Sequence, residues 1–439
     1  MVLGEHERDT KEVAPVAEAD IPKIFRDPVY GFIQVDRNIS LKVIDTKEFQ
    51  RLRHIRQLGF TSFTYHGGEH TRFAHSLGVF HLFKQVAERL AQIGDPLDSH
   101  AVMVGSLAAL LHDIGHGPFS HTLETVLTPR KHTDWTIDAI LNEESSINKA
   151  LREVDECLPD EIASVILGDY QNPILVHAIS GQFDVDRMDY LLRDSWATGT
   201  SYGNFDLDRV LMTLRTHKDQ LAFGDKYLAE QFIFARYFAY WQIYFHKTTR
   251  GIESLVKSIW KRAKRLYMDK QLEYVPSKIS PFLGEGTVAF QDYFNIDDAG
   301  IIYAIKCWSK SDDNILRDLS LRLVQRRLFK SLDVSSLERL DISEIAKDVL
   351  TEAGYEEPDY YFLVDCPSDV PYDYYTVREE EEKPPIWVYD NNTGKFGEIS
   401  KASDPIRSIA SQRVRVTRIY LPDSDCVEKL RQILFGKGA

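Results

Sequence analysis

The segment LLHDIGHGPFSH, residues 110–121, places three histidines and one aspartate among residues that are otherwise mostly apolar or small. Histidine and aspartate are poor interior residues unless they have partners. For any single histidine, an ordinary hydrogen-bonded buried imidazole is the simpler interpretation. Three histidines with an aspartate in so apolar a run favour a metal site, because neutral imidazole and carboxylate suit first-row divalent ions. With no sulfur ligand in the segment, we expect an open catalytic site and not a closed structural zinc site.

Further motifs flank this segment in a fixed order. DTKEFQRLRHIRQLG (residues 45–59) and HTRFAHSLG (70–78) precede it, and DVDRMDYLLRD (184–194) follows it. Together they resemble the signatures of the HD-domain phosphohydrolases, and more narrowly of the deoxynucleoside triphosphate triphosphohydrolases. The resemblance is to the branch that contains the sterile alpha motif and HD-domain hydrolase and its bacterial relatives. It covers residues 23–267 and continues more weakly to the C-terminus. It implies water attack at the α-phosphorus of a deoxynucleoside triphosphate, releasing deoxynucleoside and inorganic tripolyphosphate.

The resemblance also implies a metal-ligand set: His75, His112, Asp113 and Asp186 would bind one divalent transition metal. The ion could be Mn, Fe, Co, Ni or Zn, and Mg²⁺ would accompany the triphosphate. Two imidazoles and two carboxylates bring the charge near zero with a divalent ion. Such an ion polarises a phosphoryl oxygen and lowers the pKa of bound water.

Four residues are candidates for the catalytic machinery by the same resemblance. His121 would protonate the departing 5′ oxygen as general acid, and Glu124, three residues later, would hold its ring. His116 and His132 would face the phosphate chain and balance its charge in the transition state. Thr133 follows His132 where similar enzymes often have Glu, so an exposed loop histidine is the alternative interpretation of His132.

Substrate contacts are expected at three positions near the first motifs. Arg72 lies three residues before His75, so both can face one cavity from one helical turn, and arginine makes bidentate phosphate contacts. The alternative for Arg72 is a surface residue at a helix start. By resemblance, Gln57 would hold the 3′-hydroxyl and Leu58 would crowd the 2′ position. An unpaired 2′-hydroxyl beside an apolar side chain costs about 1–3 kcal/mol, which favours deoxyribose.

Two stripes of residues four apart could complete the nucleoside pocket. Asp186, Tyr190 and Asp194 form one stripe, in which the resemblance implies that Tyr190 contacts the sugar and Asp194 binds its hydroxyl. The second stripe is formed by Arg236, Tyr240 and Tyr244. Ordinary aromatic packing is its alternative interpretation. The family's nucleotide pocket is lined at the positions of Arg236 and Tyr244, so these two are the candidates.

A second nucleotide site is a further expectation from the resemblance. KIFRDPVYG (residues 23–31) and DTKEFQRLR (45–53) resemble the family's activator site between subunits of a tetramer. Asp45 and Arg53 would read a guanine, and Lys23 would contact phosphate. The alternative is a turn followed by an amphipathic surface helix.

Composition limits the class of protein. The 439 residues include 43% hydrophobic residues, and the formal net charge is −14. So acidic a chain does not favour general nucleic-acid binding, which needs clustered Lys and Arg. No apolar run approaches the roughly 20 residues that span a bilayer, and the first residues lack the apolar core of a signal peptide. We therefore expect a cytoplasmic protein with no membrane contact.

Helical periodicity predicts the elements that must position these residues. Helices are expected within residues 70–94, 99–115 (with Ser99 as the cap), 183–199, 227–267 and 312–332. Strands are expected within residues 359–367, 384–390 and 412–422. The predicted fold is mainly α. Its parts are a mobile N-terminal arm (1–20), an HD-domain helical core (21–267) and a smaller α+β C-terminal region (268–439).

Two other classes of function remain open from the sequence. An HD-domain nuclease or nucleotidase, acting on single-stranded nucleic acid or monophosphates, would use the same metal centre but would not need Arg72 and the tyrosine stripe. A non-catalytic nucleotide sensor would use binding to drive assembly, and it predicts the loss of a ligand or of the acid. His75, His112, Asp113, Asp186 and His121 are all present, which favours an enzyme.

Overall fold

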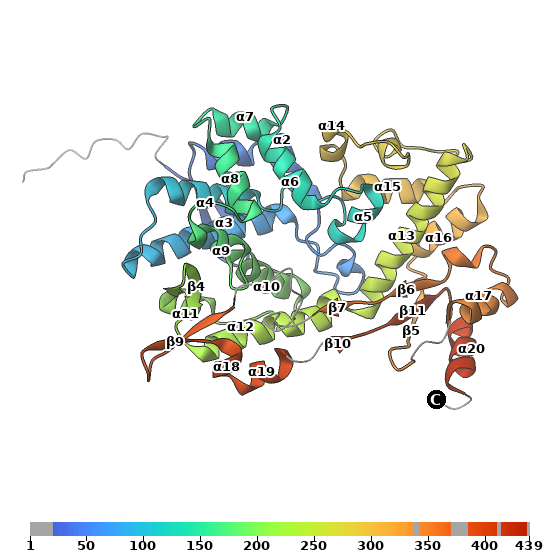
Figure 1. The fold of residues 1–439 in the computed structure, drawn as a ribbon. Coiled ribbons are helices and arrows are strands. Elements are labelled where there is room, and N and C mark those ends of the chain that lie inside the picture. Colours follow the sequence, from blue (N-terminus) through green and yellow to red (C-terminus); the bar gives the residue numbers. More distant parts are fainter. Residues whose placement is uncertain (1–20, 338–341, 370–384, 411–413, 437–439) are drawn as a thin grey trace, which may run out of the picture.

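The computed structural model describes residues 21–337, 342–369, 385–410 and 414–436. Helices form most of this part of the chain, and the short strands form an N-terminal hairpin and small sheets in the C-terminal region and at its contact with the core (Figure 1). The predicted mainly α fold, with a helical core and a smaller α+β C-terminal region, is confirmed. The predicted N-terminal arm, residues 1–20, lies outside the described residues.

The centre of the core is a group of long helices in which α3 (Arg72–Gln92) packs against both α4 (Ser99–Leu111) and α10 (Val185–Thr198). Their inward faces are apolar, and they bury side chains such as Leu77, Phe80 and Leu107. The other helices of the core are α1 (Ser40–Ile44), α2 (Lys47–Arg51), α5 (Glu124–Leu127), α6 (His132–Leu141), α7 (Ser146–Arg152), α8 (Leu158–Leu167), α9 (Pro173–Ser180), α11 (Leu207–Thr213), α12 (Lys226–Ala239) and α13 (Lys247–Met268).

The helix ends follow local capping chemistry. The expected cap Ser99 is the first residue inside α4, and the capping side chain is that of Asp98, whose Oδ1 accepts a hydrogen bond from the Ala101 amide at 2.7 Å. Aspartate and serine are both strong N-caps, so the sequence alone did not separate them. At the other end of the core, Gly199 adopts the left-handed conformation that ends α10, as its position predicts.

The helix expected over residues 227–267 is interrupted. A π-helical turn at Tyr240–Tyr244 follows α12, and the Phe245 amide bonds the Tyr240 carbonyl at 2.8 Å, five residues back. A new helix, α13, then begins after His246, whose ring nitrogen accepts the Thr248 amide. The apolar pattern runs through both helices, so periodicity did not reveal the break.

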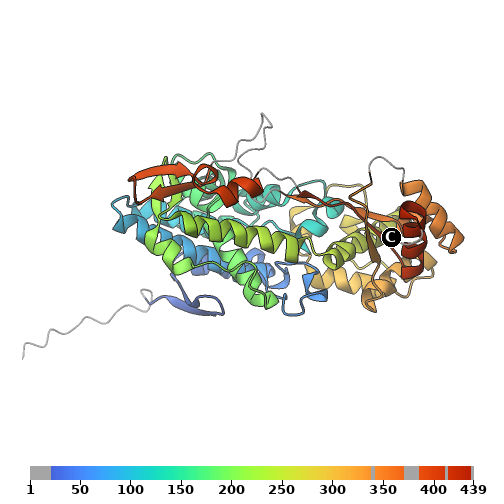
Figure 2. The same ribbon diagram turned by 90° about the horizontal axis from the view of Figure 1, so that it is seen from below.

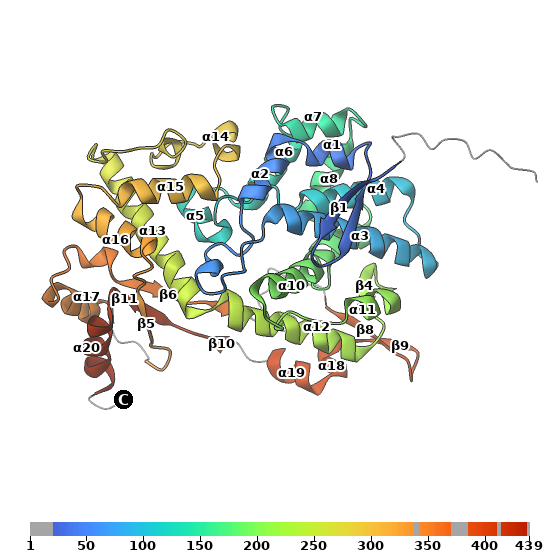
Figure 3. The ribbon, with the colours of Figure 1, turned by 180° about the vertical axis from the view of Figure 1, so that it is seen from behind.

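Two short sheets flank the core. The hairpin of β1 (Lys23–Asp27) and β2 (Gly31–Val35) is antiparallel and lies beside α3 (Figure 3). The second sheet has the order β3-β4-β8-β9 and joins distant parts of the chain, because β4 and β8 pair in parallel. Its strands are β3 (Arg215–His217), β4 (Gln220–Phe223), β8 (Trp387–Asp390) and β9 (Lys395–Glu398).

The C-terminal region runs along the length of the molecule. Its strands β8 and β9 lie at one end, and β11 and α20 lie at the other (Figures 1 and 2). Strands form within all three expected segments: β6 within 359–367, β8 within 384–390, and β10 and β11 within 412–422. β8 belongs to the sheet with β3, β4 and β9, whereas β6 and β11 form a sheet of order β5-β11-β6 and β10 pairs with β7. The elements are α14 (Phe290–Phe294), α15 (Asp298–Trp308), α16 (Asn314–Val324), α17 (Ile342–Glu352), α18 (Ile399–Ala402), α19 (Asp404–Ala410), α20 (Ser424–Phe435), β5 (Lys330–Asp333), β6 (Leu363–Asp365), β7 (Ser368–Asp369), β10 (Val414–Arg415) and β11 (Arg418–Leu421).

Across the described ranges, no helix combines the length and the apolar character needed to cross a lipid bilayer.

Candidate active site

The end of α4 presents the histidine–aspartate pair. The helix ends at Leu111, and His112 occupies the C-cap position. The His112 Nδ1 lies 2.8 Å from the Ala109 carbonyl, one of the carbonyls that a helix end leaves without an intrahelical donor. This contact makes Nδ1 the donor and leaves the Nε2 lone pair directed into the site. Asp113 follows outside the helix, so the two neighbouring side chains can approach one cavity.

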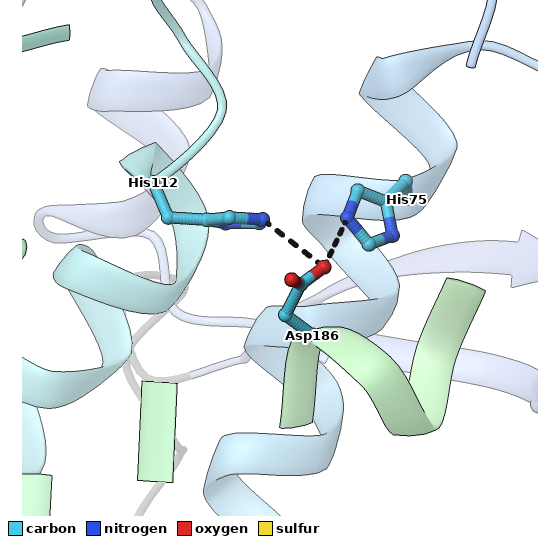
Figure 4. A group of neighbouring side chains, drawn as sticks. All are labelled: His75, His112 and Asp186. Carbon is cyan, nitrogen blue, oxygen red and sulfur yellow. Dashed lines mark ion pairs between the residues drawn. The ribbon is translucent and has the colours of Figure 1, made fainter. Parts of the chain in front are cut away.

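The four predicted ligands converge from three helices. In Figure 4, the Nε2 atoms of His75 from α3 and of His112 both point at Asp186 from α10, with distances to its Oδ1 of 3.1 and 3.7 Å. Asp113 completes the group, because its two oxygens lie 3.6 Å from His75 Nε2 and 3.5 Å from His112 Nε2. Asp113 also forms an ion pair with Arg72 and lies 3.3 Å from the His116 ring.

The electrostatics of the group favour an added cation. Burial alone lowers the pKa of His75, but the carboxylates of Asp186, Asp189 and Asp113 raise it to about 10. Burial raises the pKa of Asp186, whereas His112 and His75 hold that pKa well below its usual range. The carboxylates thus surround the imidazoles with negative potential.

The donor set fits a divalent metal ion. His75, His112 and Asp186 offer ligand atoms within 4.8 Å of one another, close enough to share one ion. The Nε2 atoms of His75 and His112 are buried, and within the described ranges neither has a hydrogen-bond partner of good geometry. Burying such atoms costs free energy unless something binds them. A divalent ion bound by imidazole nitrogen and carboxylate oxygen meets that requirement.

A buried hydrogen-bond network supports His75 from behind, and sequence reasoning missed it. The His75 Nδ1 lies 2.8 Å from Asp189 Oδ2, and Asp189 accepts two hydrogen bonds from Arg193, both at 2.8 Å. Tyr30 donates to the other Asp189 oxygen, and Arg193 also bonds Asp27 from the β1–β2 hairpin. The signal was present in DVDRMDYLLRD, where Asp189 and Arg193 are four residues apart on a helix.

A cavity of about 390 Å³ opens beside the ligand group. Asp186 lines it, together with many of the predicted substrate contacts. The predicted residues along its wall are Gln57, Leu58, Arg72, Tyr190, Asp194 and Tyr244. Arg236 is not one of the lining residues; it is buried in α12, and its guanidinium lies 5.4 Å from the ring of Tyr240, which does line the cavity.

Asp194 and Tyr244, which line the cavity, form a polar triad with His70 that the sequence did not reveal in full. Asp194 Oδ2 accepts a hydrogen bond from the Tyr244 hydroxyl at 2.6 Å, and its Oδ1 lies 2.7 Å from His70 Nε2. Tyr190 meets Tyr244 edge-on, with ring centroids 6.3 Å apart. The π-helical turn changes the geometry of the expected stripe, because Tyr240 and Tyr244 no longer stand one α-helical turn apart.

Three of the predicted catalytic side chains form a second cluster, and the fourth is not described. His116 and His132 stack with their ring centroids 4.0 Å apart. Glu124 Oε1 lies 2.8 Å from His132 Nδ1 and accepts the His132 amide, so this carboxylate holds His132. The side chain of His121 lies outside the described residues, and the expected Glu124–His121 contact therefore stays a prediction.

The residues expected at an activator site are all on the surface. Lys23 lies in β1, Asp45 follows α1, and both are exposed. Arg53 is also exposed, and its guanidinium lies 3.5 Å from the Phe73 ring centroid. Arg53 lines a second cavity, of about 500 Å³, whose other basic residues include Arg56.

Comparisons with known proteins identify relatives of this chain. The family model for the HD domain matches residues 72–192, which include all four predicted metal ligands. The chain is 38% identical to the uncharacterized protein YwfO of Bacillus subtilis, over 91% of this chain and 92% of that protein. It is 27% identical to the deoxynucleoside triphosphate triphosphohydrolase SAMHD1 of Gallus gallus, over 75% of this chain and 59% of SAMHD1.

A solved structure is similar over almost the whole chain. A phosphohydrolase from Bacteroides thetaiotaomicron is 28% identical and superposes with a TM-score of 0.81, covering 91% of this chain and 99% of that one. HD-domain membership implies a hydrolase that binds a divalent metal. The chain belongs to the family of HD-domain phosphohydrolases that also contains YwfO and the SAMHD1 deoxynucleoside triphosphate triphosphohydrolases.

Proposed function

We propose that this protein hydrolyses deoxynucleoside triphosphates to deoxynucleoside and inorganic tripolyphosphate. The observation that carries the proposal is the shared cavity. One space of about 390 Å³ is lined by Asp186 of the metal-ligand group, by Arg72, and by the Tyr190–Asp194–Tyr244 group. A nucleotide needs these three environments in one place, because it carries a reacting phosphorus, an anionic chain and a polar sugar. The similarity to SAMHD1 enzymes supports nucleotides as the substrate class.

His75, His112, Asp113 and Asp186 would hold the metal ion. When bound there, a divalent ion supplies a Lewis acid for a phosphoryl oxygen and lowers the pKa of water. Asp189 and the Ala109 carbonyl keep the two imidazole rings in the tautomer that turns Nε2 toward the ion. Mn, Fe, Co, Ni and Zn all remain candidates for this ion, and Mg²⁺ is the proposed partner of the triphosphate.

Arg72 is the proposed contact for the phosphate chain. It is 4% exposed, and its Nε donates to the Ser120 hydroxyl at 2.9 Å while its other end pairs with Asp113. These contacts fix the guanidinium at the cavity wall and reduce the entropy that substrate binding must remove. The stacked His116 and His132 would face the same chain, and His121 is the proposed general acid for the leaving 5′ oxygen.

The sugar would bind against Gln57 and Leu58. The Oε1 atom of Gln57 is buried and has no hydrogen-bond partner in the described part of the chain, so a substrate hydroxyl would satisfy it. Leu58 is apolar and cannot bond a 2′-hydroxyl. Deoxyribose is therefore the proposed preference, with Asp194 and Tyr190, which line the same cavity, as the other proposed sugar contacts.

Product analysis tests the reaction. Purified protein is incubated with each deoxynucleoside triphosphate and Mn²⁺ or Mg²⁺, first singly and then in pairs. We expect nucleoside and tripolyphosphate, lost in His112→Ala and retained in His100→Ala, a surface histidine paired with Glu161. Turnover that occurs only in mixtures supports the activator site of Lys23, Asp45 and Arg53. Light scattering independently checks whether the protein is the homotetramer that this site requires.

The other outcomes identify the alternatives. Monophosphate or pyrophosphate products contradict the proposed cleavage position. Cleavage of labelled single-stranded DNA, or of monophosphates, in place of triphosphates identifies a nuclease or nucleotidase. Nucleotide-driven assembly that persists in a His112→Ala, Asp113→Ala variant, with no turnover by the wild type, identifies a sensor.

A further inference from the structure

The loop that leads from α4 to the second cluster contains two consecutive residues in the left-handed region. Phe119 has a φ of 52° and Ser120 a φ of 47°. Neither is glycine, and the left-handed conformation is unfavourable for residues with a Cβ. Such a conformation persists only where surrounding contacts determine it.

Asp298 holds the turn from a distant part of the chain. It is the first residue of α15 and is 3% exposed. Its Oδ1 accepts the Phe119 amide at 2.8 Å, and its Oδ2 accepts the Arg56 amide at 3.0 Å. One carboxylate therefore ties the left-handed turn to the segment that carries Gln57. A neighbouring contact adds to it, because the Tyr293 hydroxyl donates to the Gly115 carbonyl at 2.8 Å.

The turn determines what faces the catalytic cavity. Phe119 and Ser120 both line that cavity. The Phe119 ring stacks on Phe60 at a centroid distance of 3.9 Å, and the Ser120 hydroxyl accepts the Arg72 Nε at 2.9 Å. A change in the Phe119 backbone therefore moves the hydroxyl that orients the Arg72 guanidinium.

We propose that Asp298 is a positioning residue, which fixes the left-handed Phe119–Ser120 turn and through it sets the orientation of Arg72 in the catalytic cavity. The catalytic part of this proposal rests on the proposed function, because Arg72 acts on substrate only there. The structural part does not depend on it. It states that the order of the 115–121 segment depends on a carboxylate almost 180 residues away in sequence.

The contact uses both side-chain oxygens of Asp298 as acceptors. Two backbone N–H groups point at Asp298, and each needs its own acceptor oxygen because both are removed from water. Asparagine offers one acceptor oxygen, and its NH₂ group would oppose the second N–H donor. Arg56 adds a cation, with its Nη1 3.6 Å from Asp298 Oδ2. A neutral amide thus keeps half of the contact, and alanine keeps none of it.

Amide hydrogen exchange tests the structural part. The protein is compared with Asp298→Ala, Asp298→Asn and the control Asp297→Asn. Asp297 is the adjacent N-cap, and its carboxylate accepts only the Gly300 amide among the contacts described for it, so it supports α15 without touching the turn. We expect peptides covering residues 115–121 to exchange about tenfold faster or more in Asp298→Ala, as for a lost bond to a charged acceptor. The rate in Asp298→Asn should lie between those of Asp298→Ala and the wild type.

Kinetics test the catalytic part. With whichever triphosphate the wild type hydrolyses, Asp298→Ala should lower kcat about tenfold or more, with partial recovery in Asp298→Asn and no loss in Asp297→Asn. The proposal is overturned if residues 115–121 exchange at the wild-type rate in a folded Asp298 variant. It is also overturned if Asp297→Asn accelerates their exchange as much as the Asp298 variants do. If Asp298→Ala does not fold, Asp298→Asn carries the comparison. If the wild type hydrolyses no triphosphate, the proposed function fails while the exchange result still decides the structural claim.

Discussion

His75 and Asp189 form a buried hydrogen-bonded pair between α3 and α10, with His75 Nδ1 2.8 Å from Asp189 Oδ2 and both side chains inaccessible to solvent. The carboxylate holds the proton on Nδ1, so that a metal ion can replace the proton on Nε2, on the opposite side of the ring, facing Asp186. Arg193 neutralises and orients Asp189 through a bidentate contact. The pair therefore joins the packing of two core helices to the ligand geometry of the proposed metal centre.

Replacing Asp189 should weaken metal binding. In Asp189→Asn the ring of His75 loses its negative partner, and we expect the affinity for Mn²⁺ to fall about 10- to 100-fold, as for other supporting ligands of metal-bound histidines. Titration calorimetry of chelator-treated protein measures it. The control is Glu161→Gln, which removes the same type of contact, 2.8 Å from His100, at the protein surface. Equal affinity in the wild type and Asp189→Asn would contradict the assigned role.

Gly78 should not tolerate a methyl group. An added Cβ would lie 1.8 Å from Asp189 Oδ1 and 2.4 Å from Arg193 Nη2, and both side chains are held in place, Asp189 by Tyr30 and Arg193 by Asp27. Alanine is the better helix former by about 1 kcal/mol, but we expect the clash to outweigh this gain, because overpacking costs about 1–3 kcal/mol. Urea unfolding should show that Gly78→Ala is destabilised and Gly286→Ala is not, because Gly286 faces open space. A Gly78→Ala variant as stable as the wild type would show that α10 can move away from α3.

Removing one hydroxyl should impair nucleoside binding. Burial and the nearby Asp194 carboxylate raise the pKa of Tyr244 well above its usual value, so Tyr244 is a hydrogen-bond donor at neutral pH. Tyr244→Phe leaves an Asp194 oxygen without this donor, at a cost of about 1–3 kcal/mol. We expect the KM for deoxynucleoside triphosphates to rise about tenfold, because Asp194 is the proposed sugar contact. Tyr65→Phe is the control, since its hydroxyl bonds the Gln242 carbonyl outside the cavity. An unchanged KM in Tyr244→Phe would contradict the assignment of Asp194 as a sugar contact.

Asp298 should make the stability of the protein depend on pH in the acidic range. Burial raises its pKa to about 6, although the Arg56 and Phe119 amides and the charges of Arg56 and Arg51 lower it. Between the unfolded pKa, near 4, and 6, the folded state binds a proton that the unfolded chain does not. The free energy of unfolding therefore falls as pH rises through this window.

When the pH falls from 7 to 5, the free energy of unfolding of the wild type should rise by about 1.4 kcal/mol relative to that of Asp298→Asn. The reason is that this interval includes about one pH unit below the folded pKa of Asp298. Urea unfolding of both proteins at pH 5, 6 and 7 measures the difference, and the other titrating groups cancel in it. A constant difference between the two proteins over this range would show that Asp298 keeps an ordinary pKa.

The sequence was informative about candidate site residues where the pattern that indicates them lies within one helix or one short segment. Helical periodicity predicted the helices that contain His75 and Asp186, and the segment around His112 indicated a metal site before any tertiary information. Spacing put Tyr190 and Asp194 on one stripe and Tyr244 on another, and the family resemblance assigned all three to one nucleoside pocket; the three line one cavity. Periodicity missed the interruption at Tyr240–Tyr244, because an apolar pattern continues through a π-helical turn without a change in composition.

The sequence by itself indicated the long core helices, the three strand segments of the C-terminal region and the residue types of the metal-ligand group, because periodicity and ligand chemistry act over a few residues. The helix expected over 312–332 was too long, because α16 ends at Val324 and β5 begins at Lys330. Only the tertiary structure decided which groups support these elements and the metal-ligand group. The contact of Asp298 with the Phe119 amide and the parallel pairing of β4 with β8 join segments more than 150 residues apart. Such contacts depend on the path of the whole chain and on the exclusion of water from its core, and neither leaves a periodic signal in the residues that meet.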